Sequence, residues 1–257
     1  MFRTSNPTLT RVSNIHEEVR KPATYKGISL KTLLLLFLTA ISAVLSVMAT
    51  NNTFGNNWAG NGLLFGINYL VLLVIASAGA LVSVMIASFI PKIAGIFAPI
   101  YAICEGLMIG FVSLIFEELY SGVVFSALMA TVITFCVMTL LYRSEIIRAT
   151  TKFRQVLYTS LIALVVSQVA FLLLTLLFPT VMLNFTSSFW LQMLISVILI
   201  IIASLCLISD LAVIQMTVEQ GLDKKYEWIA SLGLVVTLVW LYMQFLRLFA
   251  LLSSKSD

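Results

Sequence analysis

Long apolar runs separated by short polar segments are the dominant pattern of this sequence. Each run has about 20 residues or more, the length that a helix needs to cross a bilayer core about 30 Å thick. We place the runs at about 31–50, 62–90, 93–116, 122–142, 156–178, 188–217 and 228–252. The pattern therefore predicts an all-α membrane protein with seven transmembrane helices.

The basic residues between these runs alternate between many and few. The amino-terminal tail and the second, fourth and sixth loops hold all 15 Lys and Arg residues except Arg247 and Lys255. Because cytoplasmic loops are enriched in Lys and Arg, the alternation predicts a cytoplasmic amino terminus and an external carboxyl terminus. The expected organisation is a cytoplasmic tail at 1–30, a seven-helix transmembrane domain at 31–252 and a short outer tail at 253–257.

The composition argues against several other classes of protein. Apolar residues make up 61% of the chain and charged residues 10%, whereas a soluble domain is roughly half apolar and a quarter charged. The net charge of +4 follows from the basic loops and does not indicate nucleic-acid binding. The one histidine, His16, lies in the tail, and the three cysteines lie in apolar runs without paired spacing. We expect no disulfide framework, no imidazole-based transition-metal site and no cofactor, and leave any other metal site open.

Small residues are spaced to bring helices close together. The second and third runs are joined only by Pro91-Lys92, which predicts an antiparallel hairpin. The third run carries small residues at four-residue spacing: Ala94, Ala98, Ala102, Gly106 and Gly110. The second run repeats this spacing at Gly79, Ser83 and Ala87. Because small residues allow helix backbones to approach in lipid, we expect these stripes to serve packing within the hairpin, or alternatively to support a polar site beside it.

Two acids lie inside predicted spans, Glu105 near the centre of the third and Asp210 in the inner half of the sixth. An ionisable group at that depth costs at least about 2.5–3.5 kcal/mol, so each is a candidate site. Glu105 is either a neutral acid bonded to a neighbouring helix or a titrating or ion-coordinating group in a polar cavity. Gln244, on one face of the seventh run with Gly233 and Thr237, either makes a core hydrogen bond or lines a functional path.

Several segments resemble one family of membrane proteins. The segment 98–110 reads APIYAICEGLMIG and is similar to a hallmark of the bacterial subgroup of the Bax inhibitor/YccA family, within the transmembrane Bax inhibitor motif superfamily. The ending resembles the same family at 224–228 (KKYEW), 238–242 (LVWLY) and 246–248 (LRL), and the start does so at 5–9 (SNPTL). The resemblance implies a fold in which the last helix is central and the other six surround it. It also implies an integral, multi-pass protein of the bacterial cytoplasmic (inner) membrane.

The same resemblance implies two kinds of function. Better-studied relatives conduct a slow, pH-dependent calcium leak, which an aspartate pair on the sixth and seventh helices opens or closes. Asp210, in the segment SDLAVIQ, resembles the sixth-helix aspartate, whereas the acid position on the seventh helix falls on Gln244. Glutamine cannot titrate, so we expect weak or no pH gating here, and Gln244→Glu should create or strengthen it.

Two functional hypotheses from different classes stay open at this point. The first is a passive cation (calcium) leak or its regulator, with Asp210, Glu105 and Gln244 as the ion-pathway or pH-sensing residues. The alternative is an interaction protein that restrains a membrane-embedded ATP-dependent protease, as other relatives do. An enzyme is not expected. An intramembrane aspartyl protease needs two aspartates within spans, and only Asp210 is there; a rhomboid-type serine protease needs an intramembrane histidine, and His16 is in the tail. A retinal protein would need a lysine in the seventh span, which has none. The sequence leaves the oligomeric state open.

Overall fold

A computed structural model describes residues 22–54, 63–64, 67–147, 149–177 and 188–255. Over these residues the chain is built almost wholly of helices. The helices are α2 (Tyr25–Phe54), α3 (Tyr69–Phe89), α4 (Ala94–Leu119), α5 (Val123–Arg143), α6 (Thr151–Leu177), α8 (Phe189–Glu219) and α9 (Tyr226–Ser253). Two short strands, β1 (Leu63–Leu64) and β2 (Ile67–Asn68), form an antiparallel hairpin just before α3.

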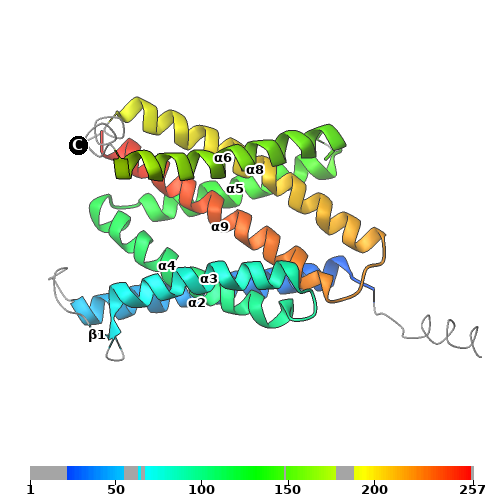
Figure 1. Cartoon of the computed structure of the whole chain (residues 1–257), viewed down its shortest axis with the longest axis horizontal. Helices are drawn as coiled ribbons and strands as arrows, with labels where there is room; N and C mark the ends of the chain where they lie inside the picture. Colours follow the sequence, from blue (N-terminus) through cyan, green and yellow to red (C-terminus); the bar gives the residue numbers. More distant parts are fainter. Residues whose placement is uncertain (1–21, 55–62, 65–66, 148, 178–187, 256–257) are drawn as a thin grey trace, which may run out of the picture.

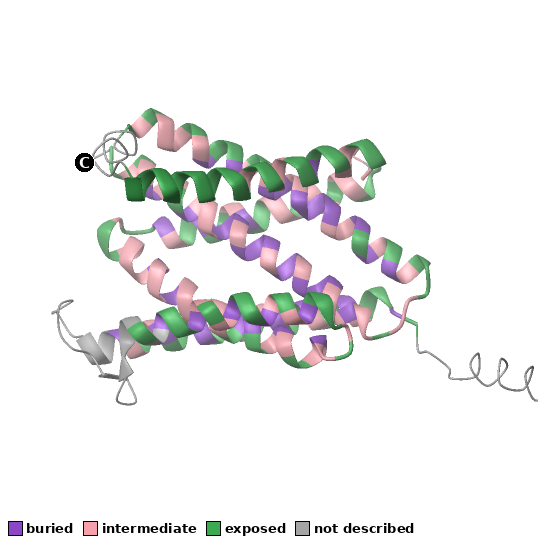
Figure 2. Ribbon diagram, in the orientation of Figure 1, coloured by how far each residue is buried: buried purple, intermediate pink, exposed green. Residues whose placement is uncertain are grey.

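The last helix, α9, lies at the centre of the bundle. It contacts α2, α3, α4, α5 and α8, and it crosses between a group formed by α2, α3 and α4 and a second group formed by α5, α6 and α8 (Figure 1). Buried residues are concentrated along α9 and the sides of the helices that face it, whereas α6 packs against α8 and is exposed along nearly its whole length (Figure 2). The expected central last helix is therefore confirmed.

The seven predicted spans match the seven helices of the described residues. Six of these helices are long and apolar enough to cross a membrane, and α3 is an apolar helix of 21 residues. The predicted second span was too long at its start, because 63–64 and 67–68 are short strands and the helix begins only at Tyr69. The first helix begins earlier than predicted, at Tyr25, so the end of the expected tail is helical, while 1–21 lie outside the described residues.

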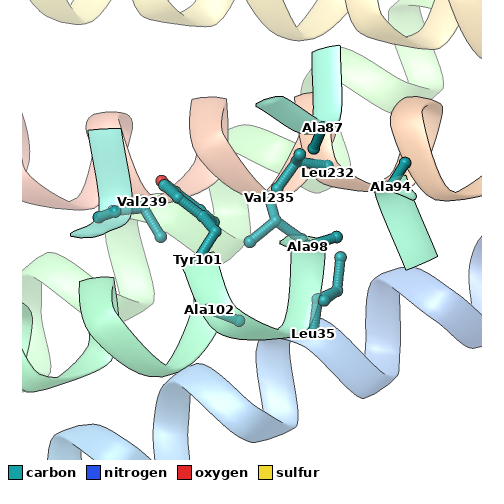
Figure 3. Close-up of a cluster of buried hydrophobic side chains, with 10 residues drawn as sticks. Leu35, Ala87, Ala94, Ala98, Tyr101, Ala102, Leu232, Val235 and Val239 are labelled. Carbon is teal, nitrogen blue, oxygen red and sulfur yellow. The ribbon is translucent and has the colours of Figure 1, made fainter. Parts of the chain in front are cut away.

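The small residues of α4 fill the space between three helices. Ala98 and Ala102 are fully buried and belong to a cluster that also includes Leu35 from α2, Ala87 from α3 and Val235 from α9 (Figure 3). Apolar packing in this cluster joins the amino-terminal group of helices to the central helix. Because alanine side chains are short, α4 approaches its neighbours closely enough for van der Waals contact along its length.

The closest approach of α4 is to α2 and not to α3. A Cβ atom added at Gly106 would overlap Ser42 Oγ and the carbonyl oxygen of Thr39, and one added at Gly110 would lie 2.8 Å from Ala43 Cα. The expected α3–α4 hairpin is present, but at Gly79 an added Cβ would meet only Cys104 Sγ, at 3.4 Å. The expectation that the glycines serve the hairpin was therefore wrong: they let the backbones of α2 and α4 meet.

Candidate functional site

Asp210 lies on α8 at the face that packs against α9. A Cβ atom added at Gly233 of α9 would lie 3.8 Å from Asp210 Oδ1, so the carboxyl group sits directly beside that glycine. The Thr237 side chain, one turn further along α9, is a near neighbour of the same carboxyl group. The second oxygen, Oδ2, is buried and has no hydrogen-bond partner among the described residues.

Two further buried oxygens without a partner lie on the same pair of helices. They are Oγ of Ser196 on α8 and Oε1 of Gln244 on α9. Ser196 and Asp210 are separated by two heptads and therefore share one face of α8, about 21 Å apart along the axis. Gln244 is seven residues beyond Thr237, about 10 Å along the antiparallel helix, which places it at a level between them. We call the set Ser196, Asp210, Thr237 and Gln244 the α8–α9 seam.

Unpaired buried oxygens are uncommon, and each needs a physical explanation. A buried donor or acceptor without a partner costs about 1–3 kcal/mol, and more if it is charged. Water or a cation that enters the seam would supply the missing partner. The α8–α9 seam therefore presents unpaired oxygens at three levels, spread over about 21 Å along α8 and α9.

The structure does not pair Asp210 with Gln244. Among the described residues no hydrogen bond joins the two side chains, and the Gln244 oxygen is unpaired. The residues of α9 that face the aspartate are Gly233 and Thr237. The seventh-helix position that resembles the acid of the family's pair is thus about two turns away from Asp210 in this chain.

Glu105 occupies a separate site. It lines a partly open cavity of about 330 Å³ between α3, α4 and α9, together with Tyr101, Ser77, Val236 and other residues. Val236 and Thr237 are consecutive on α9 and point about 100° apart, so the two acids lie against different faces of the central helix. The two acids therefore form two independent candidate sites.

One charged pair was not anticipated from the sequence. The Lys31 Nζ atom of α2 lies 2.5 Å from Oε2 of Glu227, which is almost completely buried in the first turn of α9. The other carboxylate oxygen of Glu227 accepts a hydrogen bond of 2.9 Å from the backbone N–H of Thr24. The sequence places Lys31 at a span end, where a lysine can reach the headgroup level without a partner, and the 196-residue separation of the pair left no local signal.

The described residues contain no group of three or more His, Cys, Asp or Glu side chains that could hold a metal ion. Tight calcium sites use six to eight oxygen ligands, with carboxylates prominent among them. The α8–α9 seam contributes a single carboxylate, fewer than such a site uses.

The fold and the seam define an integral, multi-pass α-helical membrane protein with a buried acid beside its central helix. Residues 6–254 match the family described as "Bax inhibitor 1 like". The match covers nearly the whole chain, and the protein belongs to this family. A comparison with curated proteins finds no match.

Proposed function

We propose that the protein is a passive cation leak, with calcium as the cation, or the regulator of such a leak. The observation that carries the proposal is the α8–α9 seam, in which Asp210, Gln244 and Ser196 each present a buried oxygen without a partner among the described residues. A cation moving past these oxygens exchanges part of its hydration shell for them. Asp210 is the seam's one ionisable acid and supplies the negative charge that favours cations over anions.

The leak should be slow and only weakly dependent on pH. Each level of the seam offers one or two oxygens, which is too few to replace the shell of a calcium ion, so passage requires water to enter as well. Thr237, the near neighbour of Asp210 on α9, cannot carry a charge. The proton-sharing carboxylate pair that gates relatives therefore has no counterpart beside this aspartate.

The experiment is a flux assay with the purified protein in liposomes. A calcium-sensitive dye inside the vesicles reports entry of the ion, and protein-free liposomes give the background rate. We expect entry above background, with a shallow dependence on pH between 6 and 8. Entry at the background rate at every pH would refute the leak.

A second candidate is an interaction protein that restrains a membrane-embedded ATP-dependent protease. The observation that favours it is Gln168, an exposed polar side chain near the middle of α6. A polar group exposed to lipid is unfavourable, and a hydrogen bond to a partner helix would remove that cost. Gln168→Leu should then weaken restraint of such a protease in a co-reconstituted system without changing calcium entry. Unchanged restraint would argue against α6 as the contact.

We propose that the protein lies in the bacterial cytoplasmic membrane, with its amino terminus inside. The alternation of charge supports this orientation, because the helices place the α3–α4, α5–α6 and α8–α9 loops at the same end as the start of α2 (Figure 1). We propose no catalytic activity for either acid.

A further inference from the structure

A second cavity lies at the end of the bundle where α2 begins. It measures about 430 Å³, within the range of about 300–1,000 Å³ that is common for small-ligand pockets. Three separate segments line it: the start of α2, the α3–α4 turn and the α8–α9 turn with the first turn of α9. Its lining residues are Lys31, Pro91, Lys92, Gly95, Lys224, Lys225 and Trp228. We call it the four-lysine pocket.

The pocket keeps a positive charge after its internal ion pairs are counted. Lys31 is neutralised by Glu227, and Lys225 lies 2.9 Å from Asp223. Lys92 and Lys224 are exposed and take part in no ion pair within the described residues. Two lysine charges are thus available to an anion that enters.

The four-lysine pocket is a more specific arrangement than a loop that is merely rich in basic residues. The positive-inside tendency explains why lysines gather at this end, but it does not explain why four of them converge on one cavity beside an aromatic ring. Lys31 Nζ lies 5.0 Å from the centroid of the Trp228 ring, so the indole forms a wall of the cavity at the level where the spans begin. Tryptophan favours this interfacial level of a bilayer, which is also the level of lipid phosphates.

We propose that the four-lysine pocket binds the phosphate group of an anionic molecule at the membrane surface, either an acidic phospholipid headgroup or a soluble phosphate. Lysine ammonium groups bind phosphate as point charges, and basic pockets between helices on the cytoplasmic side suit anionic headgroups. The phosphate would bridge Lys92 of the α3–α4 turn and Lys224 of the α8–α9 turn. It would thereby tie the two groups of helices together at this end.

The test compares two double variants that remove equal charge from the same end of the bundle. Lys92→Gln with Lys224→Gln empties the pocket of its available charges. Arg143→Gln with Lys152→Gln removes exposed charges from the end of α5 and the start of α6 and leaves the pocket intact. One arm measures retention of phosphatidylglycerol against phosphatidylcholine by native mass spectrometry. The other arm titrates inorganic phosphate into the protein in phosphatidylcholine nanodiscs and follows it by calorimetry.

We expect selective binding in one arm, weakened about thirtyfold by the pocket variant, since each lysine near an anionic surface contributes roughly a fivefold factor. The control variant should bind like wild type. Loss in the lipid arm identifies a headgroup, and loss in the phosphate arm identifies a soluble ligand. Equal effects of the two double variants in both arms, or no selective binding by wild type, would overturn the proposal. The single variant Lys92→Gln, at an exposed position, repeats the test with an expected fivefold loss and a smaller risk to folding.

Discussion

The close contact between α2 and α4 leaves no room for a side chain at Gly106. A methyl group at Gly106 would overlap Ser42 Oγ and the backbone oxygen of Thr39, so either the Ser42 side chain or the α2 backbone must move. Ser42 is itself buried, and its hydroxyl donates to the Thr39 oxygen at 3.0 Å. The substitution Gly106→Ala therefore disturbs both a close backbone contact and a buried hydrogen bond.

The expected cost follows from these contacts. Overpacking a filled core costs about 1–3 kcal/mol, and a lost hydrogen bond adds about 1 kcal/mol. Alanine recovers about 1 kcal/mol over glycine in a helix. The net loss for Gly106→Ala is about 1–3 kcal/mol, which corresponds to a fall of roughly 2–12 °C in the midpoint of thermal unfolding. The larger Gly106→Leu and Gly110→Leu should abolish stable folding.

Gly79→Ala is the matched control for this measurement. It makes the same change inside a helix of the same bundle, but the new methyl group would meet only Cys104 Sγ, at 3.4 Å. Its midpoint should be unchanged or slightly higher than that of wild type, because only the gain in helix propensity remains. Thermal unfolding of the purified variants in one detergent gives the comparison. Equal midpoints for Gly106→Ala and Gly79→Ala would refute the assignment of the glycine contact to α2.

Three further predictions concern the charged groups and the topology. Lys31→Met should lower the free energy of unfolding by about 3–5 kcal/mol, because it leaves Glu227 buried without its cation. Thermal unfolding should show that the double variant Lys31→Met with Glu227→Met recovers much of that loss. Thr237→Asp should make calcium flux fall steeply at low pH, because two adjacent carboxylates share a proton. Gln244→Glu, two turns from Asp210, should have a weaker effect on the same pH profile. Equal pH profiles for the two variants would contradict the register of α8 against α9. A reporter fused after the last residue should be active only outside the cytoplasm, and cytoplasmic activity would remove the seven-span topology.

The number of helices could be predicted from the sequence because lipid imposes a simple rule. A span must be apolar over about 20 residues, and loop charge alternates with topology, so both signals repeat along the chain. The same rule did not predict the start of α3 correctly. Leu63, Leu64, Phe65 and Ile67 lie just before the apolar run of α3, and hydropathy does not separate short apolar strands from the first turns of a helix.

The sequence does not predict which helices pack against each other, or the register of α8 against α9, for a different reason. A stripe of small residues shows that some helix comes close, but α2 and α3 both carry small residues, and only tertiary packing assigns Gly106 to Ser42. Likewise, a motif fixes where Gln244 lies on α9 but not which residue of α8 it meets. The sliding of α8 against α9 sets that register, and it places Thr237 beside Asp210.

The most direct test of ion passage along the α8–α9 seam is calcium entry into liposomes by two charge-removing variants. Asp210→Asn and Glu105→Gln each replace a membrane acid by its amide of equal shape, one in the seam and one in the cavity between α3, α4 and α9. We expect Asp210→Asn to reduce the entry rate at least severalfold at neutral pH, and Glu105→Gln to leave it unchanged. Entry that survives Asp210→Asn but is lost with Glu105→Gln would contradict the account and move the path to the Glu105 cavity.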